Sequence, residues 1–324
     1  MLLRRKPVLC NYYVTYRCNA TCSFCDIWER PSPYVNSENF SRNLIDLKKL
    51  GVKIIDFTGG EPLLHQHIHL MLKEAKSLGF ITTLTTNGLL YPKKAGLLKG
   101  LVDMLHFSLD SPDEESHNAS RGVACFAHVQ DSIRIARSMG EKPDILFTVF
   151  EHNLHEIKPM WEEYALRQNL VLILNPVFEY NQVATGNRLT DMQLNELRSW
   201  GRKKNVFLND AFIQLRLDGG NHTNSPVCKA VTTTIVINPQ NELVLPCYHL
   251  GIESIPIQDN LFSLYQSEQV QKIKEMEGRF PGCEGCTVNC YFQPSFTVNL
   301  NQYWLLAAPS ALKYNWLKGT WRKL

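Results

Sequence analysis

Short apolar runs alternate with amphipathic stretches over the first two thirds of the chain. The apolar runs are bounded by Gly, Pro, Asn or Asp, which is typical of buried strands in a parallel sheet. Six of them span residues 8–16, 53–58, 80–86, 104–110, 144–150 and 170–177. The stretches between them, such as residues 37–50, 66–78 and 126–139, have apolar positions at helical spacing. Six strand–helix units over about 200 residues predict an α/β fold, a partial (β/α)6 TIM-like barrel.

The alternation of strand and helix patterns ends at about residue 210. Residues 232–238 and 242–246, joined by Pro239-Gln240-Asn241, predict a β-hairpin, and residues 261–277 predict a helix. We therefore expect a barrel in residues 1–212, a small second domain in residues 213–292 and a tail in residues 293–324.

Composition excludes several classes of protein. Hydrophobic residues make up 44% of the 324 residues, enough for a large core, so the chain need not be disordered. Its 34 basic and 31 acidic residues leave a net charge of +3, which does not suggest a nucleic-acid binder. There is no apolar run of about 18 residues and no signal-peptide pattern at the start. We expect a cytoplasmic protein without a nucleic-acid partner.

The ten cysteines fall into two groups. One group is Cys18, Cys22 and Cys25, and the other is Cys228, Cys247, Cys283, Cys286 and Cys290. Clustered cysteines in a chain without a secretion signal indicate metal or cluster ligands rather than disulfides. Cys10 and Cys125 stand apart, and we expect them to be buried, inert thiols.

The first group has three cysteines just after the first predicted strand. The carboxyl ends of barrel strands face the active site. A structural zinc site or a ferredoxin-type cluster requires four protein ligands, whereas three thiolates on a [4Fe-4S] cube leave one iron open. A zinc site with its fourth ligand elsewhere in the chain is the alternative.

Further motifs follow this loop at the ends of the next strands. They are Gly59-Gly60-Glu61-Pro62, Thr85-Thr86-Asn87-Gly88 and Ser108-Leu109-Asp110. In this order, together with Cys18-x3-Cys22-x2-Cys25 and Phe24, they resemble the motifs of the radical S-adenosylmethionine (SAM) superfamily over most of the chain. The resemblance implies that Cys18, Cys22 and Cys25 bind a [4Fe-4S] cluster whose fourth iron is chelated by SAM. It implies SAM-binding roles for Gly59, Gly60, Glu61, Pro62, Asn87, Ser108, Asp110 and Arg121.

Chemistry suggests how some of these residues would act. Glycines let backbone approach a ligand closely, and Glu61 can accept a hydrogen bond from the SAM ammonium group. Arg121, which we expect to open the fourth helix with Gly122, can pair with the SAM carboxylate. Turn, cap or surface roles remain alternatives for Asn87, Ser108, Asp110 and Arg121. The sequence identifies no catalytic acid or base.

The second cysteine group resembles a SPASM or twitch domain. Cys228 and Cys247 flank the predicted hairpin, and Asn241 stands in its turn where that family usually has Gly. The resemblance implies one auxiliary [4Fe-4S] cluster bound by Cys228, Cys247, Cys283 and Cys286, with Cys290 as an alternate ligand. A full SPASM domain has seven cysteines and two clusters. A structural zinc site is the alternative.

The resemblance implies a reaction class. SAM would be cleaved reductively to methionine and a 5′-deoxyadenosyl radical, which abstracts hydrogen from a peptide, carbohydrate or lipid-linked substrate. An electron donor such as flavodoxin or ferredoxin is implied, and an auxiliary cluster favours a net oxidation. The alternative is a non-catalytic zinc or iron–sulfur protein on the same barrel.

Residues 301–324 are rich in aromatic and basic residues and contain no acid. This composition fits a segment at an anionic membrane surface. The alternative is a tail that packs over the barrel or caps the substrate pocket. We expect Pro309 and Gly319 to interrupt any long helix.

Overall fold

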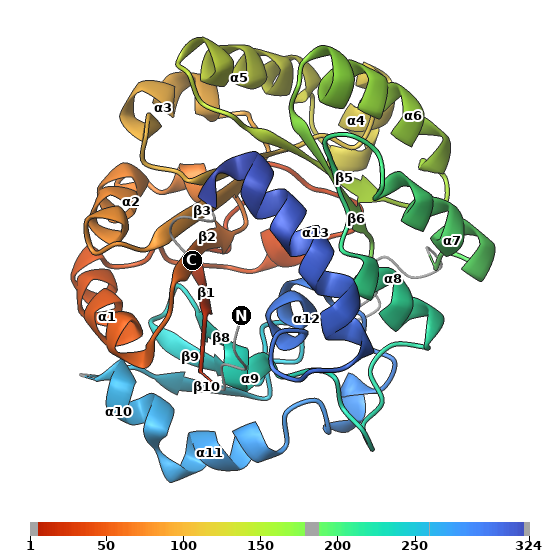
Figure 1. Cartoon of the computed structure of the whole chain (residues 1–324). Helices are drawn as coiled ribbons and strands as arrows, with labels where there is room; N and C mark the ends of the chain where they lie inside the picture. The colour runs from red at the N-terminus through yellow and green to blue at the C-terminus, as the bar shows by residue number, and fades with distance from the viewer. Residues whose placement is uncertain (1–5, 179–187, 259, 321–324) are drawn as a thin grey trace.

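A single ten-stranded sheet forms the centre of the molecule (Figure 1). The computed structural model describes residues 6–178, 188–258 and 260–320. Parallel strands run in chain order through β1 (Leu9–Thr15), β2 (Ile54–Gly59), β3 (Ile81–Thr86), β4 (Met104–Ser108), β5 (Asp144–Val149), β6 (Val171–Pro176) and β7 (Val206–Phe207). The first six confirm the six predicted strands within a few residues.

Helices cover the outer side of the curved sheet (Figure 1). They are α1 (Ser37–Leu50), α2 (Ile68–Ser77), α3 (Tyr91–Leu98), α4 (Glu114–Arg121), α5 (Phe126–Ser138), α6 (Ile157–Met160) with the wider-turned η4 (Trp161–Arg167), α7 (Asp191–Trp200) and α8 (Asp210–Leu217). Local signals set their ends: in α1, Asn36 accepts hydrogen bonds from the first turn and Gly51 closes the helix at φ +95°. The core lies between these helices and the sheet, with Phe40, Phe57 and Phe107 fully buried.

The sheet is open, with β10 and β7 at its edges. The predicted hairpin is confirmed as β8 (Thr234–Ile237) and β9 (Glu242–Leu245), with Asn241 in the left-handed region at φ +63°. A third strand, β10 (Glu253–Pro256), pairs with β9. β8 pairs in parallel with β1, so the barrel sheet continues into the segment that contains the second cysteine group. The expected partial barrel with a small cysteine-rich addition is therefore confirmed.

Two predicted helical boundaries are wrong. Arg121 closes the fourth helix instead of opening it, because Asp113 caps the start of α4 and Gly122, at φ +64°, ends it. Residues 261–277 form two helices, α10 (Leu261–Gln266) and α11 (Glu268–Glu275). Ser267 separates them because it is extended and caps the start of α11. The remaining helices of this part are α9 (Ala230–Thr233) and α12 (Asn289–Ser295).

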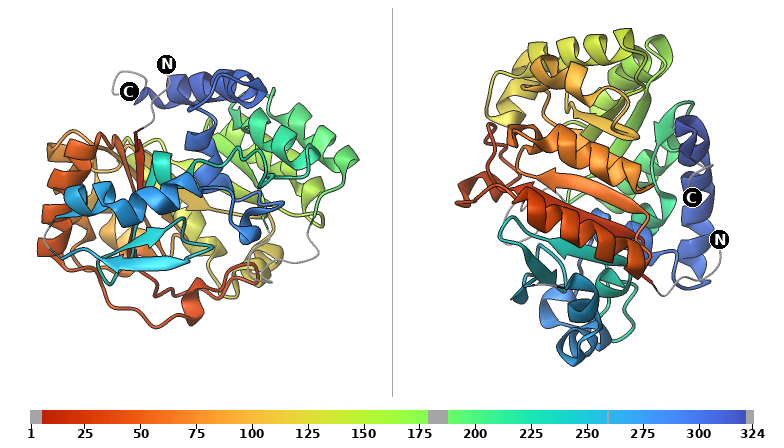
Figure 2. Two further views of the ribbon diagram at one scale, coloured as in Figure 1. Left: turned by 90° about the horizontal axis from the view of Figure 1, so that it is seen from below. Right: turned by 90° about the vertical axis from the view of Figure 1, so that its left-hand side faces the viewer.

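The tail forms one helix, α13 (Gln302–Lys318), which lies across the end of the barrel where the strands begin (Figures 1 and 2). The prediction that Pro309 interrupts a long helix is wrong, whereas Gly319 ends the helix at φ +70°. Tyr314 donates a hydrogen bond of 2.7 Å to Asp144, the first residue of β5, and Lys318 approaches the same carboxylate at 2.9 Å. The tail therefore packs over the barrel, at the end opposite the cysteine loop. Within the described residues, no helix is long and apolar enough to cross a membrane.

Candidate functional site

The first cysteine group lies in the loop that leaves β1 at its carboxyl end. The amides of Thr21 and Ser23 donate to the carbonyls of Arg121 and Ser120 at 3.1 and 3.3 Å, which fixes the loop against the end of α4. A Cβ on Gly122 would lie 2.3 Å from Thr21 Oγ1, so this contact requires glycine. Cys18, Cys22 and Cys25 are all partly exposed. The predicted loop is therefore held rigidly at the carboxyl face of the barrel.

Cys18 is the thiol of this group whose acidity the surroundings change most clearly. Burial first, and then the nearby Glu61, Cys22 and Cys25, raise the pKa of Cys18 to about 12, against a hydrogen bond from the Ala20 backbone. Without a cation, the Cys18 thiol stays protonated at neutral pH. A bound metal centre would stabilise the thiolates, so the donor set and its surroundings fit a cluster.

Gly59 and Gly60 place the end of β2 against the end of β1. The amides of Gly60 and Glu61 donate to the carbonyls of Thr15 and Arg17, both at 2.9 Å. A Cβ on Gly60 would lie 2.2 Å from the Arg17 carbonyl oxygen. The close backbone approach expected of these glycines occurs between two strands of the chain itself. Their contact with SAM stays a prediction, as does that of Pro62, the first residue of the short helix η2 (Pro62–Leu64).

Glu61 ties the end of β2 to the end of β3. Its side chain is buried and accepts hydrogen bonds from the Leu63 amide at 3.0 Å, Thr86 Oγ1 at 2.8 Å and the Asn87 amide at 2.9 Å. Burial raises the pKa of Glu61, and these hydrogen bonds oppose the shift. Three donors leave room for about one more on the two carboxylate oxygens. The predicted contact with the SAM ammonium group is compatible with this arrangement and remains a prediction.

Asn87 and Ser108 lie at the ends of β3 and β4. The Asn87 amide nitrogen Nδ2 donates to Asn19 Oδ1, in the cysteine loop, at 2.8 Å. Ser108 is buried. The ends of three neighbouring strands thus converge on the cysteine loop, as the parallel arrangement predicts.

A buried ion pair joins β4 to the first cysteine group. Arg121 Nη2 lies 2.7 Å from Asp110 Oδ2, and both side chains are almost fully buried. The other side of the guanidinium faces the loop, because Nη1 is 3.9 Å from Cys22 Sγ and the ring of Phe24 lies 5.3 Å away. Arg121 Nε is buried and has no hydrogen-bond partner among the described residues. An unsatisfied donor beside the three thiols fits a site for an anionic group such as a carboxylate.

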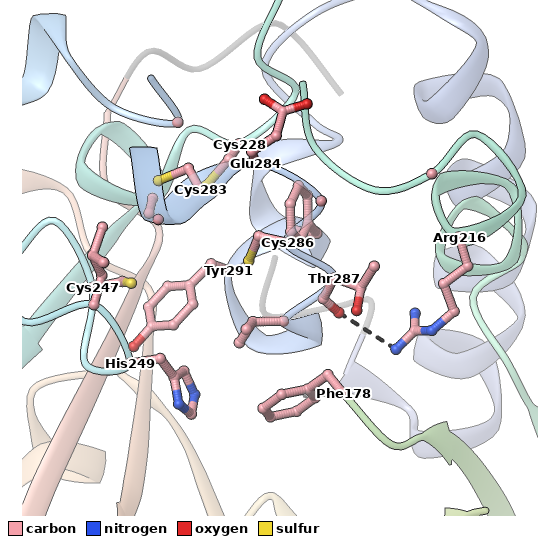
Figure 3. Close-up of a pocket in the computed structure, with 18 of the residues that line it drawn as sticks. Phe178, Arg216, Cys228, Cys247, His249, Cys283, Glu284, Cys286, Thr287 and Tyr291 are labelled. Carbon is pink, nitrogen blue, oxygen red and sulfur yellow. Dashed lines mark hydrogen bonds between the residues drawn. The ribbon is translucent and has the colours of Figure 1, made fainter. Parts of the chain in front are cut away.

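The second cysteine group surrounds a cavity of about 700 Å³ (Figure 3). Cys228, Cys247, Cys283 and Cys286 all line it. In Figure 3, Cys247, Cys283 and Cys286 lie on one side of the cavity with Tyr291, and Arg216 lies on the other. Burial raises the pKa of all four thiols, and Arg216 partly offsets the shift of Cys286. Three separate segments of the chain therefore bring four thiols to one cavity.

Asn221 joins these segments, and the sequence analysis missed it. Its buried amide donates to the carbonyls of Gly278 and Cys283 and accepts from the amides of Val227 and Cys228. Its own backbone exchanges hydrogen bonds with Gly285 and Cys286. The only local signal is the preceding Gly219-Gly220, where a Cβ on Gly220 would lie 2.4 Å from the Gly285 carbonyl oxygen.

The remaining cysteines lie outside the cavity lining. Cys290 has its sulfur 4.0 Å from His249 Nε2. Cys10 and Cys125 are fully buried, as predicted, and Cys125 Sγ lies 3.3 Å from His117 Nε2. Cys25 of the first group and Cys247 of the second both border one aromatic cluster, in which Tyr13 and Tyr248 stack with ring centroids 4.4 Å apart. One buried cluster therefore packs against a cysteine of each group.

The four thiols at the cavity are donors that suit either of two metal centres. Among the described residues, no group of three His, Cys, Asp or Glu side chains is already arranged to hold a single metal ion. A structural zinc ion would draw its four ligands to bond lengths of about 2.3 Å, whereas a [4Fe-4S] cluster distributes its thiolates over four irons. A cavity with four surrounding thiols therefore fits an auxiliary cluster, with zinc as the alternative.

Residues 12–162 match the model of the radical SAM superfamily. The AdoMet-dependent heme synthase of Nitratidesulfovibrio vulgaris is 32% identical over 160 residues, which cover 48% of this chain and 44% of the synthase. The GTP 3′,8-cyclase of Desulforamulus reducens is 28% identical over 187 residues, which cover 54% of this chain and 57% of the cyclase. The chain thus matches about half the length of these relatives.

Two solved structures have a similar fold over most of the chain. Streptococcus suis SuiB bound to its precursor peptide SuiA has a TM-score of 0.67 at 17% identity, covering 83% of this chain and 66% of SuiB. The enzyme anSMEcpe with bound AdoMet has a TM-score of 0.65 at 16% identity, covering 96% of this chain and 97% of anSMEcpe. At these identities the similarity establishes the fold alone, an open α/β barrel with a small C-terminal addition.

Proposed function

Because residues 12–162 form a radical SAM domain, we propose that this enzyme cleaves SAM at a [4Fe-4S] cluster bound by Cys18, Cys22 and Cys25. The observation that carries the proposal is the position of Arg121, which links Asp110 to the cysteine loop and keeps one buried donor unsatisfied. When bound, the cluster would supply the electron for reductive cleavage of SAM, and the resulting 5′-deoxyadenosyl radical would abstract hydrogen from the substrate.

The chain's own residues would bind and orient SAM. Arg121 would hold the SAM carboxylate through its free donors, while Asp110 fixes the guanidinium in place. Glu61 would accept a hydrogen bond from the SAM ammonium group, and Gly59, Gly60 and Pro62 would shape the adjacent turn. Asn87 and Ser108, at the ends of β3 and β4, would contact the remainder of SAM. Phe24 and Phe150, whose ring centroids are 5.1 Å apart, would exclude water from the site.

The second proposal concerns an auxiliary [4Fe-4S] cluster bound by Cys228, Cys247, Cys283 and Cys286. All four thiols line one cavity, so we propose them as the ligands. Cys290 lies outside that lining but near Cys247 and Cys286, and it is the alternate ligand. A cluster at this position could accept an electron from a substrate radical, which favours a net two-electron oxidation. An external donor such as flavodoxin or ferredoxin would reduce the first cluster.

A peptide is the substrate that we favour. SuiB binds a precursor peptide, and anSMEcpe has been solved with bound peptides. Beyond the four thiols, the cavity is lined by both apolar and polar groups, including Phe178, Leu194, Arg216 and Thr287. A carbohydrate or a lipid-linked molecule is the alternative.

The decisive experiment is anaerobic reconstitution with iron and sulfide counting, followed by a 5′-deoxyadenosine assay with SAM and dithionite. We expect about eight irons per chain and formation of 5′-deoxyadenosine. A Cys18→Ala/Cys22→Ala/Cys25→Ala variant should lose about four irons and all SAM cleavage. A Cys283→Ala/Cys286→Ala variant should lose about four irons. It should still cleave SAM, but without oxidising a substrate. Cys10→Ala, which changes a buried thiol outside both groups, is the matched control.

Two outcomes would contradict the proposal. If the second cysteine group bound zinc without sulfide, the proposal of an auxiliary cluster would be wrong, and the proposal that the first group binds the SAM cluster would stand. Fully loaded clusters that never cleave SAM would favour a non-catalytic iron–sulfur protein.

A further inference from the structure

The tail helix carries a concentration of exposed large apolar side chains. Among the described residues, four of the five most exposed large apolar side chains lie on or just before α13. They are Leu300 (67%), Leu305 (65%), Leu312 (72%) and Trp316 (74%). The fifth, Met192 at 79%, stands alone on α7. Single exposed apolar residues are ordinary, whereas a contiguous group marks an interaction site.

These side chains form one ridge along the helix. Leu305, Pro309, Leu312 and Trp316 follow one another at intervals of four, three and four residues, which places them on one face. We call these four residues the apolar ridge. The opposite face, with Tyr303, Ala307 and Tyr314, is buried against the barrel. A surface helix normally has one apolar face, so a second, exposed one is a candidate interaction surface.

Basic groups flank the ridge. Lys313 donates to the carbonyls of Gly201 and Lys203, at 3.0 and 2.8 Å, and this contact places the loop of Arg202, Lys203 and Lys204 beside α13. Lys318 bonds to the Lys142 carbonyl, which places Lys142 beside the carboxyl end of the helix. The side chains of these four flanking residues are exposed.

The acidic side chains of Asp144, Asp218 and Glu141, near α13, interact with other groups of the protein. Asp144 is buried against Lys318 and Tyr314, and Asp218 accepts a hydrogen bond of 2.7 Å from Tyr303. Glu141, next to Lys142, accepts a hydrogen bond from the Gly100 amide. Asp218 and Glu141 keep their negative charge because their donors are neutral, but the four exposed cations Lys142, Arg202, Lys203 and Lys204 outnumber them.

We propose that the apolar ridge docks on an anionic lipid surface, with the flanking basic loops facing the phosphate headgroups. A convex ridge between cations can enter a bilayer interface without a preformed groove. A symmetric dimer through the same face would bring the Lys142 and Arg202–Lys204 regions of two copies together and is opposed by charge. The ridge lies at the end of the barrel where the strands begin, so docking would leave the cysteine loop facing away from the membrane.

Vesicle flotation of the intact chain tests this inference. We expect the protein to float with vesicles that contain phosphatidylglycerol, to bind phosphatidylcholine vesicles weakly, and to dissociate as salt is added. The Leu312→Ser/Trp316→Ser variant should bind at least about tenfold more weakly. Leu70→Ser and Met192→Ser, which change exposed apolar residues on other faces, are the matched controls and should bind like the unchanged protein.

Fluorescence distinguishes insertion from adsorption. Lipids brominated on their acyl chains should quench part of the tryptophan emission, and Trp316→Phe should remove most of that quenching while binding persists. Failure to float, or flotation that the ridge substitutions leave unchanged, would overturn the inference. Light scattering could instead show a dimer that the same substitutions dissociate. That result would assign the ridge to self-association and would also overturn the inference of lipid docking.

Discussion

Arg121 and Asp110 form a buried ion pair of 2.7 Å between the end of α4 and the end of β4. The pair matters because Asp110 uses its other oxygen to accept a 3.0 Å hydrogen bond from the Thr148 amide on β5. Asp110 therefore fixes the Arg121 guanidinium relative to β4 and β5. Arg121 in turn contacts Cys22 in the cysteine loop.

The first prediction concerns this guanidinium. Arg121→Lys keeps the positive charge for Asp110 but removes the fork of donors and the free Nε. We expect the SAM dissociation constant to rise about 10- to 100-fold, with iron content unchanged. Anaerobic titration calorimetry on the reconstituted protein measures it. Arg134→Lys, on the exposed side of α5, is the control, and equal SAM affinity in both variants would contradict the assignment.

The second prediction concerns the glycine pair at the end of β2. Gly60→Ala would place its Cβ 2.2 Å from the Arg17 carbonyl oxygen, so β1 and β2 must move apart. We expect a lower melting temperature and loss of iron from the first cluster. Gly96→Ala, in α3 with open space around it, should instead stabilise the chain by about 0.5–1 kcal/mol. Normal iron loading of Gly60→Ala would show that the contact is tolerated.

The third prediction separates the late cysteines. Cys286 lines the cavity and Cys290 does not. Cys286→Ala should lower the iron count by up to about four per chain, and Cys290→Ala should leave it unchanged. Iron and sulfide assays, with circular dichroism to check folding, compare the two variants. The reverse pattern would make Cys290 the ligand.

The fourth prediction concerns the contact of α13 with the barrel. Lys318→Met leaves Asp144 as a buried carboxylate without its lysine, which should cost about 3–5 kcal/mol of unfolding free energy. Lys313→Met removes only hydrogen bonds to two carbonyls and should cost about 1 kcal/mol. Thermal unfolding of the two variants measures the difference, and equal losses would refute a special role for the Asp144 pair.

The fifth prediction concerns pH. Burial lowers the pKa of His106, which lies against Tyr314, from about 6.5 to about 4. The unfolded chain therefore binds this proton more readily, so the stability that His106 contributes is present above pH 6.5 and is lost as pH falls towards 4. His106→Gln should lose less stability than the unchanged protein over this range, by roughly 1–3 kcal/mol. Urea unfolding at several pH values tests this, and parallel pH profiles would rule it out.

The sequence predicted most of the sheet and the clustering of the strand-end motifs. Apolar runs are local signals, and parallel strands bring their carboxyl ends to one face whatever the details of the loops. The error at Arg121 arose from a short helix whose cap signals, Asp113 and Gly122, were present but not used. Pro309 is tolerated inside α13 because it lies on the exposed face, where water can solvate the carbonyl that its missing N–H leaves free.

Other parts of the site had no local signature. Asn221 donates hydrogen bonds to residues more than fifty positions away, and the preceding Gly219-Gly220 is only a weak sign of its buried position. The additional strand β10 and the shared aromatic cluster of Tyr13 and Tyr248 likewise depend on tertiary packing. Sequence patterns indicate the ligands of such a site better than the residues that hold them in place.

The pairing of β1 with both β2 and β8 has a mechanical consequence. Cys18 follows β1 and Cys247 follows β9, so both cysteine groups are attached to one sheet through the pairing of β1 with β8 and of β8 with β9. Groups bound by the two sets of thiols would then be anchored to the same sheet, and adaptation to substrates of different size would fall to the loops.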